Sequence, residues 1–292
     1  MIRCYFLLGI AGLWSTLALA NQQIERRAPL AADATVEISN VSGSISVSGW
    51  NRDEVEVTGS MGEHSSLEFD SNTQRATIKI ATQRFFWWSN ESATLNVRVP
   101  IRSRLVVAAV SADTTVQAVH GSLKLQSVSG GINAEAWSED LEAKTVSGDV
   151  TVSGHQGNAV FDLSSVSGDF KVSGIGGEIN VSTVSGNANL KLGSVTRSKL
   201  HTTSGDLTFL GELAKQARVD AETVSGDVEL ILRGTRDAEY ELRTFSGDIE
   251  NCFGPSVRGT HSPGQDLRFT EGGGSARVRT KTLSGKLRLC DR

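Results

Sequence analysis

The sequence predicts an all-β chain that folds as one parallel β-solenoid, and three observations lead to this prediction. A Thr/Ser-Val-Ser-Gly-Asp unit recurs at nearly regular spacing. Apolar and polar residues alternate with a period of two on both sides of its glycine, which is typical of short, half-buried strands. Apolar residues at the spacing typical of a helix are not found among the repeat units. With 38% hydrophobic and 21% charged residues over 292 positions, the composition suits an ordered chain of one elongated domain or two smaller ones.

Residues 1–20 are expected to be a cleaved signal peptide. A short positive start is followed by a mostly apolar stretch, Cys4–Leu17, and then by the small-x-small pattern of Ala18-Leu19-Ala20. This stretch is shorter than the roughly 20 residues that span a bilayer, and a retained transmembrane helix is the alternative. We expect no transmembrane segment after leader cleavage. The formal net charge of −4 argues against nucleic acid as a partner.

Residues 21–109 are expected to form a β-rich N-terminal cap together with the first rungs. Runs such as Leu95–Val99 alternate well, but they show no fixed period. A solenoid needs a cap because an uncovered end exposes an unpaired strand edge. Four consecutive aromatic side chains cannot all point inward from one strand, so we expect either a plug in the cap or a contact loop for a partner, glycan or lipid surface. These aromatic residues are Phe85, Phe86, Trp87 and Trp88.

Residues 110–292 are expected to form the repeat solenoid. The glycines of successive units lie 18 to 21 residues apart, except for a last interval of 38, which is twice 19. Each unit offers two strands of about five residues and leaves no room for a crossover helix. Stacked units would pair equivalent strands at about 4.8 Å per layer, and right-handed winding is the default for parallel crossovers. The repeat glycines are Gly130, Gly148, Gly168, Gly186, Gly205, Gly226, Gly247 and Gly285.

The Ser-Gly-Asp step is expected to form the corner between the two strands of a unit. Glycine would supply a positive φ there, and the Ser and Asp side chains would bond exposed backbone amides. The valine before each Ser-Gly lies an odd number of positions from the preceding apolar residues, as Val146 does from Ala143. The sequence leaves two alternatives open: a bulge intervenes, or the valine faces outward.

Two polar ladders would run along this corner if the units stack. The matching threonines would form a row of hydroxyls, an arrangement that also resembles an ice-binding face. The aspartates after the glycines are expected to cap the corner, and a row of weak calcium sites is the alternative. These aspartates are Asp149, Asp169, Asp206, Asp227 and Asp248, with Asn187 in the equivalent place.

No constellation in the sequence predicts a catalytic residue, a cofactor or a metal site. The nucleophile motif Gly-x-Ser-x-Gly does not occur, and the serines of the Ser-Gly steps recur once per unit, as structural residues do. The histidines lack metal-ligand spacing and are expected at the surface. They are His64, His120, His155, His201 and His261.

Two cysteines remain after leader cleavage, and both lie five residues after a repeat glycine. If residues 253–283 hold an insertion and the two units stack directly, the separation of Cys252 and Cys290 suits a disulfide. If a full rung lies between them, the gap is about twice 4.8 Å and the bond cannot form without distortion. The glycine-rich composition of the intervening segment favours an insertion, so we predict a Cys252–Cys290 clasp on the last rungs.

Together these features resemble the bacterial "putative adhesin" family, a domain of unknown function. The resemblance covers most of residues 30–290. It rests on the leader, the Gly49-Trp50-Asn51 step, the serial Thr-Val-Ser-Gly-Asp-Val units, and the endings Asn251-Cys252-Phe253-Gly254 and Leu289-Cys290. The resemblance implies an exported, adhesin-like β-solenoid of a Gram-negative envelope, and it transfers no catalytic motif.

The leading functional hypothesis is a non-enzymatic, exported β-solenoid that acts as a binding or structural element of the cell envelope. It would lie in the periplasm or on the outer surface, with an envelope protein or a glycan as its partner. Two alternatives stay open. One is a polysaccharide-acting β-helix enzyme, for which long loops forming a cleft would be expected. The other is a periplasmic sensor or regulatory accessory that binds a membrane partner.

Overall fold

The computed structural model describes residues 22–82, 92–137, 139–155, 157, 159–234, 236–257 and 264–291, and every regular element in these ranges is a β-strand. The expected leader and the aromatic run at residues 85–88 lie outside the described residues. The first strands are β1 (Gln22–Pro29), β2 (Thr35–Trp50), β3 (Glu54–Met61), β4 (Ser65–Asn72), β5 (Arg75–Thr82), β6 (Ala93–Pro100) and β7 (Arg104–Gln117).

The remaining strands fall into a middle group of short strands and a C-terminal group. The middle group is β8 (Leu123–Gln126), β9 (Ile132–Ala136), β10 (Leu141–Lys144), β11 (Val150–Gly154), β12 (Val160–Ser164), β13 (Phe170–Ser173) and β14 (Gly177–Thr183). The C-terminal group is β15 (Ala188–Ser204), β16 (Leu207–Ser225), β17 (Val228–Arg233), β18 (Ala238–Ser246), β19 (Ile249–Asn251), β20 (Gln265–Glu271), β21 (Ala276–Ser284) and β22 (Leu287–Asp291).

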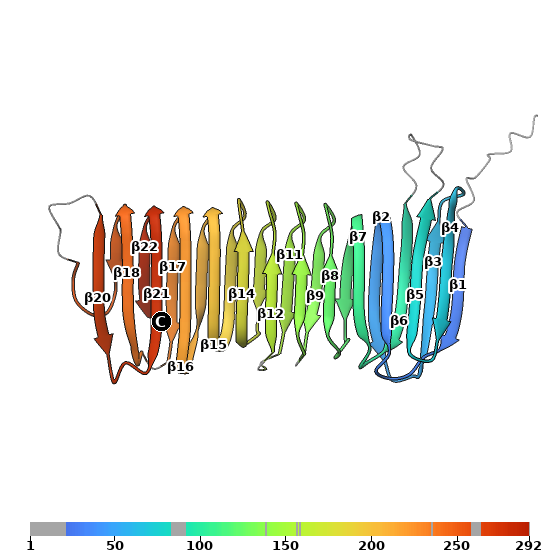
Figure 1. Ribbon diagram of the computed structural model, residues 1–292, viewed down its shortest axis with the longest axis horizontal. Helices are drawn as coiled ribbons and strands as arrows, with labels where there is room; N and C mark the ends of the chain where they lie inside the picture. Colours follow the sequence, from blue (N-terminus) through green and yellow to red (C-terminus); the bar gives the residue numbers. More distant parts are fainter. Residues whose placement is uncertain are drawn as a thin grey trace, which may run out of the picture.

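The strands lie across the long axis of a rod (Figure 1). The chain coils along this axis and alternates between two sides, which we call face I and face II. Four long strands, β2, β7, β15 and β16, bend around one corner and contribute to both faces. Face I has the order β1-β3-β6-β2-β7-β9-β11-β13-β15-β16-β17-β22-β19, and face II has the order β4-β5-β2-β7-β8-β10-β12-β14-β15-β16-β21-β18-β20.

In the middle of the rod each repeat unit stacks on the next in parallel register. On face II, Leu141 of β10 lies between Leu123 of β8 and Phe161 of β12. The equivalent row on face I places Val150 of β11 between Ile132 and Phe170. These side chains point inward and are buried, and they belong to one apolar cluster that continues along the rod. The stacked, parallel, all-β architecture predicted from the sequence is therefore present.

At both ends of the rod the order in space departs from the order in the sequence. At the N-terminal end, β2 is inserted between β7 and the pair β5 and β6. At the C-terminal end, β21 and β22 are inserted between β16 and β17 on one side and β18 and β19 on the other. Figure 1 accordingly shows the C-terminus set back from β20, the strand at that end.

Antiparallel strands lie at three of the four sheet ends, and the fourth, on face I at the C-terminal end, is the parallel strand β19. Strands β1, β3 and β4 pair antiparallel at the N-terminal end, and β20 pairs antiparallel with β18 at the other. The segment expected as a β-rich start thus supplies a cap, but it also supplies the parallel strands β2, β5 and β6. The domain boundary expected between residues 109 and 110 falls inside β7.

Candidate functional surfaces

The repeat glycines form a column at the corner where the chain passes from face II to face I. A Cβ atom added to Gly168 would overlap the carbonyl oxygen of Gly148, and one added to Gly148 would overlap that of Gly130. The expected reason for these glycines, a positive φ, holds for Gly226, Gly247 and Gly285. It is wrong for the other five, where the close approach of neighbouring rungs leaves no room for a side chain.

The residue three places before each glycine turns its hydroxyl inward. The backbone N–H of Gly148 donates to Thr145 Oγ1 at 2.9 Å, and that of Gly168 donates to Ser165 Oγ at 2.7 Å. These side chains are buried, so the row of hydroxyls predicted from the sequence exists but does not form a surface. The buried members are Ser127, Thr145, Ser165, Thr183, Thr202, Thr223, Thr244 and Thr282.

The corner aspartates bind the backbone of the next rung, which supports the expected capping role. Asp149 Oδ1 accepts a hydrogen bond from the N–H of Asp169 at 3.0 Å, and Asp169 Oδ1 accepts one from the N–H of Asn187 at 2.8 Å. The amide oxygen of Asn187 does the same for Asp206 at 2.9 Å. A neutral amide therefore serves at this position as well as a carboxylate, and backbone bonding accounts for the ladder without a cation.

The repeat valines face outward, which resolves the alternative that the sequence left open. They form a continuous line along the corner, which we call the corner ridge. Its neighbours are joined by the backbone, since the N–H of Ser147 donates to the carbonyl of Val128 at 2.8 Å and that of Ser167 to Val146 at 2.9 Å. Its members are 42% to 60% exposed and, in order along the rod, are Val41, Val110, Val128, Val146, Val166, Val184, Val224, Leu283 and Phe245.

The two cysteines join neighbouring rungs at the C-terminal end. Asn251 of β19 lies opposite Leu289 of β22, so the residues that follow, Cys252 and Cys290, are adjacent. They form a disulfide with a Cα–Cα distance of 4.8 Å. The two units stack directly because residues 264–271 leave the coil to form the antiparallel strand β20.

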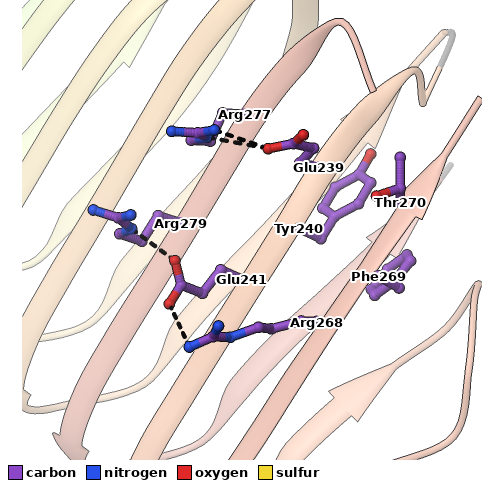
Figure 2. A pocket seen from close by; sticks show the side chains of 8 residues that line it. All are labelled: Glu239, Tyr240, Glu241, Arg268, Phe269, Thr270, Arg277 and Arg279. Atoms are coloured by element: carbon purple, nitrogen blue, oxygen red, sulfur yellow. Dashed lines mark hydrogen bonds and ion pairs between the residues drawn. The ribbon is translucent and has the colours of Figure 1, made fainter. Parts of the chain in front are cut away.

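Face II carries ion pairs between side chains of adjacent strands. At its C-terminal end lies a group that we call the Arg–Glu cluster, which borders a depression of about 420 Å³ (Figure 2). Glu241 contacts Arg279 at 3.0 Å and Arg268 at 3.3 Å, and it also contacts Arg243 at 2.8 Å. The members of the cluster are Glu239, Glu241, Arg243, Arg268, Arg277 and Arg279.

On face II the outward residues of β21 are all cationic, namely Arg277, Arg279 and Lys281. Each contacts an acid on a neighbouring strand, and Arg277 reaches Glu239 with two of its nitrogens, at 2.9 and 3.3 Å. Arg277 is 60% exposed and Arg279 is 40% exposed. These guanidinium groups therefore have donors left that can reach an external carboxylate or phosphate.

A second group of charges on face II lies near the middle of the rod, beside a depression of about 360 Å³. Glu142 contacts Lys144, and it contacts Lys124 of the preceding rung at 3.0 Å. These hydrogen bonds, first from Lys144 and then from Lys124, hold the pKa of the Glu142 carboxyl below its usual range. The two lysines thus stabilise the ionised form of Glu142, and the pair Glu142–Lys124 joins opposite charges on neighbouring rungs.

At the opposite corner an aromatic stack follows the ends of three face I strands. The ring of Trp137 lies between those of His120 and His155, with centroid distances of 3.9 and 4.3 Å. His155 and His201 are exposed, whereas His120 is half-buried. His155 and His201 are therefore at the surface, as expected, and His120 and His155 also stack on the ring of Trp137. His261 lies outside the described residues.

Two further features were sought in the described ranges, a group of metal-binding side chains and a membrane-spanning helix. No three His, Cys, Asp or Glu side chains there come together in a group that could hold a metal ion. The same ranges contain no helix long and apolar enough to cross a membrane. The Arg–Glu cluster has no signal in the sequence, because β18 and β21 become neighbours only through the insertion at the C-terminal end.

One family model and several solved structures match the chain. The family described as Toastrack DUF4097 matches residues 20–177 and again residues 177–289. One similar structure is a putative adhesin from Parabacteroides distasonis, with 13% identity, 94% of this chain and 98% of the other covered, and a TM-score of 0.49. Another is a putative adhesin from Bacteroides fragilis, with 12% identity, 93% and 98% coverage, and a TM-score of 0.47. A putative lipid binding protein from Parabacteroides distasonis has 12% identity, 91% and 96% coverage, and a TM-score of 0.46. No curated protein matches the chain.

Proposed function

The chain belongs to the Toastrack DUF4097 family, and we propose that it is a non-enzymatic, exported β-solenoid that serves as an adhesin-like binding or structural rod of the cell envelope. It acts after removal of residues 1–20, in the periplasm or on the outer surface of a Gram-negative bacterium. The proposal includes right-handed winding, which follows from the general preference of parallel crossovers.

The observation that supports this proposal best is the continuity of the rod. One apolar core runs from Ile24 on β1 to Leu267 on β20, and antiparallel strands lie at the N-terminal end of both faces and at the C-terminal end of face II. Strands linked rung by rung through backbone hydrogen bonds make a stiff support that holds outward side chains at fixed spacing. A stiff rod with ordered outward charges suits binding or spacing better than it suits chemistry.

The contact surface that we propose is the Arg–Glu cluster on face II. Its arginines are exposed, they are held in place by acids on neighbouring strands, and they retain free donors. Such a lattice of fixed charges binds a partner that carries carboxylates or phosphates, such as an anionic glycan or an acidic protein surface. Because the charges lie at the surface, this binding is expected to weaken as the salt concentration rises.

Location is tested by fractionating cells that express the full chain and by shaving whole cells with protease. We expect an envelope-associated protein whose N-terminus begins after residue 20. Cleavage by external protease would place it on the surface, and protection would place it in the periplasm. A cytoplasmic pool that retains the intact leader would overturn the proposed export.

Binding is tested by co-sedimentation of the purified mature protein with envelope fragments from the same cells. Replacing two cations of the cluster, Arg277→Glu with Arg279→Glu, is expected to weaken binding at least tenfold. Lys171→Glu is the matched control, because Lys171 is an exposed cation on β13 of face I. Equal loss in both variants, or no loss in either, would contradict the assignment of the contact surface.

The absence of enzymatic activity is tested separately. The mature protein is incubated with a panel of pectic and algal polysaccharides, and new reducing ends and unsaturated products are measured. We expect no difference from a heat-inactivated sample. Sustained product formation by the native protein would replace the binding proposal with the polysaccharide-acting alternative.

A further inference from the structure

Three arginines of face II lie in register on adjacent strands of the C-terminal group, and we call them the arginine row. Arg197 of β15 lies opposite Arg218 of β16, and Arg218 lies opposite Arg277 of β21. All three residues are exposed. Like charges directly opposite one another in a sheet are destabilising, so the row costs stability in the chain by itself.

Within the described residues, acids pair with the two outer arginines of the row and not with the middle one. Glu178 contacts Arg197 at 3.5 Å. Glu239 accepts two hydrogen bonds from Arg277, at 2.9 and 3.3 Å. The side chain of Arg218 makes no ion pair or hydrogen bond with any residue in the described part of the chain. The middle of the row is therefore a cation that lies between two other cations and has all its donors free.

The repeat does not require an arginine at this position of the rung. Ser122, Asp140 and Val160 occupy the equivalent position in three earlier rungs. Arg104 occupies it on β7, but its neighbour in register there is Thr35. The row itself is complete only because β21 is inserted beside β16. A costly arrangement that the repeat does not impose is a mark of a functional site.

A depression of about 270 Å³ is bordered by both Arg218 and Arg277, and Gln216 also lines it. Gln216 belongs to a bulge, because β16 has the four residues 214–217 where β15 has Thr196 alone. Its φ of 60° is a left-handed conformation that is uncommon for a residue other than glycine. Bulges and strained residues of this kind occur next to binding sites, where they aim side chains.

We propose that the arginine row binds a ligand that carries neighbouring phosphate groups. A carboxylate has a single charge, and the row already holds one carboxylate at either end. A phosphate monoester carries a charge of about −1.5 to −2 and three acceptor oxygens, and the fork of an arginine binds it with two parallel hydrogen bonds. Because the rungs are about 4.8 Å apart, two adjacent guanidinium groups can share one phosphate, and a second phosphate can reach the third arginine.

The inference deepens the proposed function and rests on it, because Arg277 belongs both to the arginine row and to the Arg–Glu cluster. It adds Arg197 and Arg218 to the contact surface, and it names phosphate as the group that this part of face II recognises. Neighbouring phosphates are presented by the headgroups of a phospholipid surface and by soluble phosphate compounds. The chemistry of recognition is the same for both sources, and the experiments separate them.

The test is isothermal titration calorimetry of the purified mature protein with inorganic pyrophosphate at low salt. Arg218→Gln is expected to weaken binding at least tenfold, because the two arginines that remain are paired with acids. Arg104→Gln is the matched control and is expected to bind as the wild type does, because Arg104 is an exposed arginine at the equivalent position of another rung. A wild-type protein that does not bind pyrophosphate, or equal losses in the two variants, would overturn the inference.

Thermal unfolding separates a binding role of Arg218 from a structural one. Without phosphate, Arg218→Gln is expected to unfold at the same temperature as the wild type or at a higher one, because the substitution removes repulsion between like charges. Pyrophosphate is expected to raise the unfolding temperature of the wild type but not that of the variant. A variant that unfolds at a lower temperature without phosphate would show that Arg218 supports the fold and would contradict the inference.

Flotation with phosphatidylglycerol vesicles identifies the source of the phosphate. If the wild type floats, and both pyrophosphate and Arg218→Gln abolish flotation, the row binds lipid headgroups. Pyrophosphate binding without flotation would assign the row to a soluble phosphate compound. A wild type that sediments with envelope fragments but does not bind pyrophosphate would overturn this inference and leave the proposed function intact. A wild type that binds pyrophosphate but not envelope fragments would support the inference and contradict the proposed function.

Discussion

The middle of the rod and its C-terminal end are built from the same repeat, but they are held together differently. In the middle, strands that are neighbours in space come from successive units, and the backbone, the glycine column and the corner aspartates join them. At the C-terminal end the last unit is inserted between two earlier ones. There a disulfide supplements the contacts that both regions share, and ion pairs such as Arg288–Glu229 join residues that are far apart in the sequence.

This difference shows what a tandem repeat can and cannot specify. Each middle rung is closed by contacts between adjacent units, which are separated by 18 to 21 residues. The inserted rung depends on contacts of much longer range, such as that between Asp227 and the N–H of Lys286, 59 residues away. Longer loops cost more entropy to close, so the end needs additional bonds that the middle does not.

The largest effect is expected from removal of the disulfide with Cys252→Ala and Cys290→Ala. The bond closes a loop between residues 38 apart, so its loss should lower the stability of the C-terminal end by about 4 kcal/mol in the chain-entropy model. Hydrogen exchange should show increased exchange in β18–β22 while β8–β13 stay protected. Uniformly faster exchange along the rod would show that the two regions unfold as one unit and would remove the distinction between them.

The next largest effect is expected from Gly130→Ala in the middle of the rod. The added Cβ would overlap the carbonyl oxygen of Ala112, and the resulting displacement of the rung should cost about 3 kcal/mol. Gly131→Ala is the matched control, because a Cβ on the next residue meets its nearest neighbour, Asp113 Oδ1, at 3.6 Å. Urea unfolding of the two variants and the wild type measures the loss of stability caused by each substitution. Similar losses in the two variants would contradict the close-approach explanation of the column.

These glycines also show how far the sequence could predict the fold. Their spacing predicted the stacked units, and the glycine-rich segment between Cys252 and Cys290 predicted the insertion that makes their two units adjacent. The reason assigned to the glycines was wrong for five of them, because a sequence shows that a side chain is excluded but not whether φ or a neighbouring rung excludes it.

The surface could be predicted less well than the interior. Alternation determines which strand residues point inward. The valine of each corner lies where the chain bends, so the geometry of the bend decides whether its side chain points inward or outward. The Arg–Glu cluster could not be predicted, because Glu241 and Arg279 meet only after β21 is inserted beside β18. The order of rungs at the ends leaves no periodic signal in the chain.

A smaller effect is expected at the corner aspartates of the middle rungs. Asp169→Ala removes the acceptor for the N–H of Asn187 and should cost about 1 kcal/mol. Asp169→Asn should cost less, because Asn187 itself accepts the equivalent bond from Asp206. Thermal unfolding in the presence of a calcium chelator measures the loss of stability in each of the two variants. If the chelator alone lowers the stability of the wild type, the aspartates bind cations and backbone bonding is not their only role.

The smallest effect is expected from Tyr240, which gives the core of the C-terminal end a titratable group where the middle has Phe161 and Phe170. Burial raises the pKa of the Tyr240 phenol well above its usual value, so the folded state keeps the proton after the unfolded state has released it. The free energy of unfolding should therefore be unaffected below about pH 10 and should fall above that value. Lysines also titrate in this range, so the informative quantity is the difference between the wild type and Tyr240→Phe. Hydrogen exchange in β18–β22 should show a difference that grows with pH, whereas exchange in β8–β13 should show none. A difference that does not depend on pH would mean that the Tyr240 hydroxyl acts through its hydrogen bond to the Arg236 carbonyl, at 3.4 Å, and not through its ionisation.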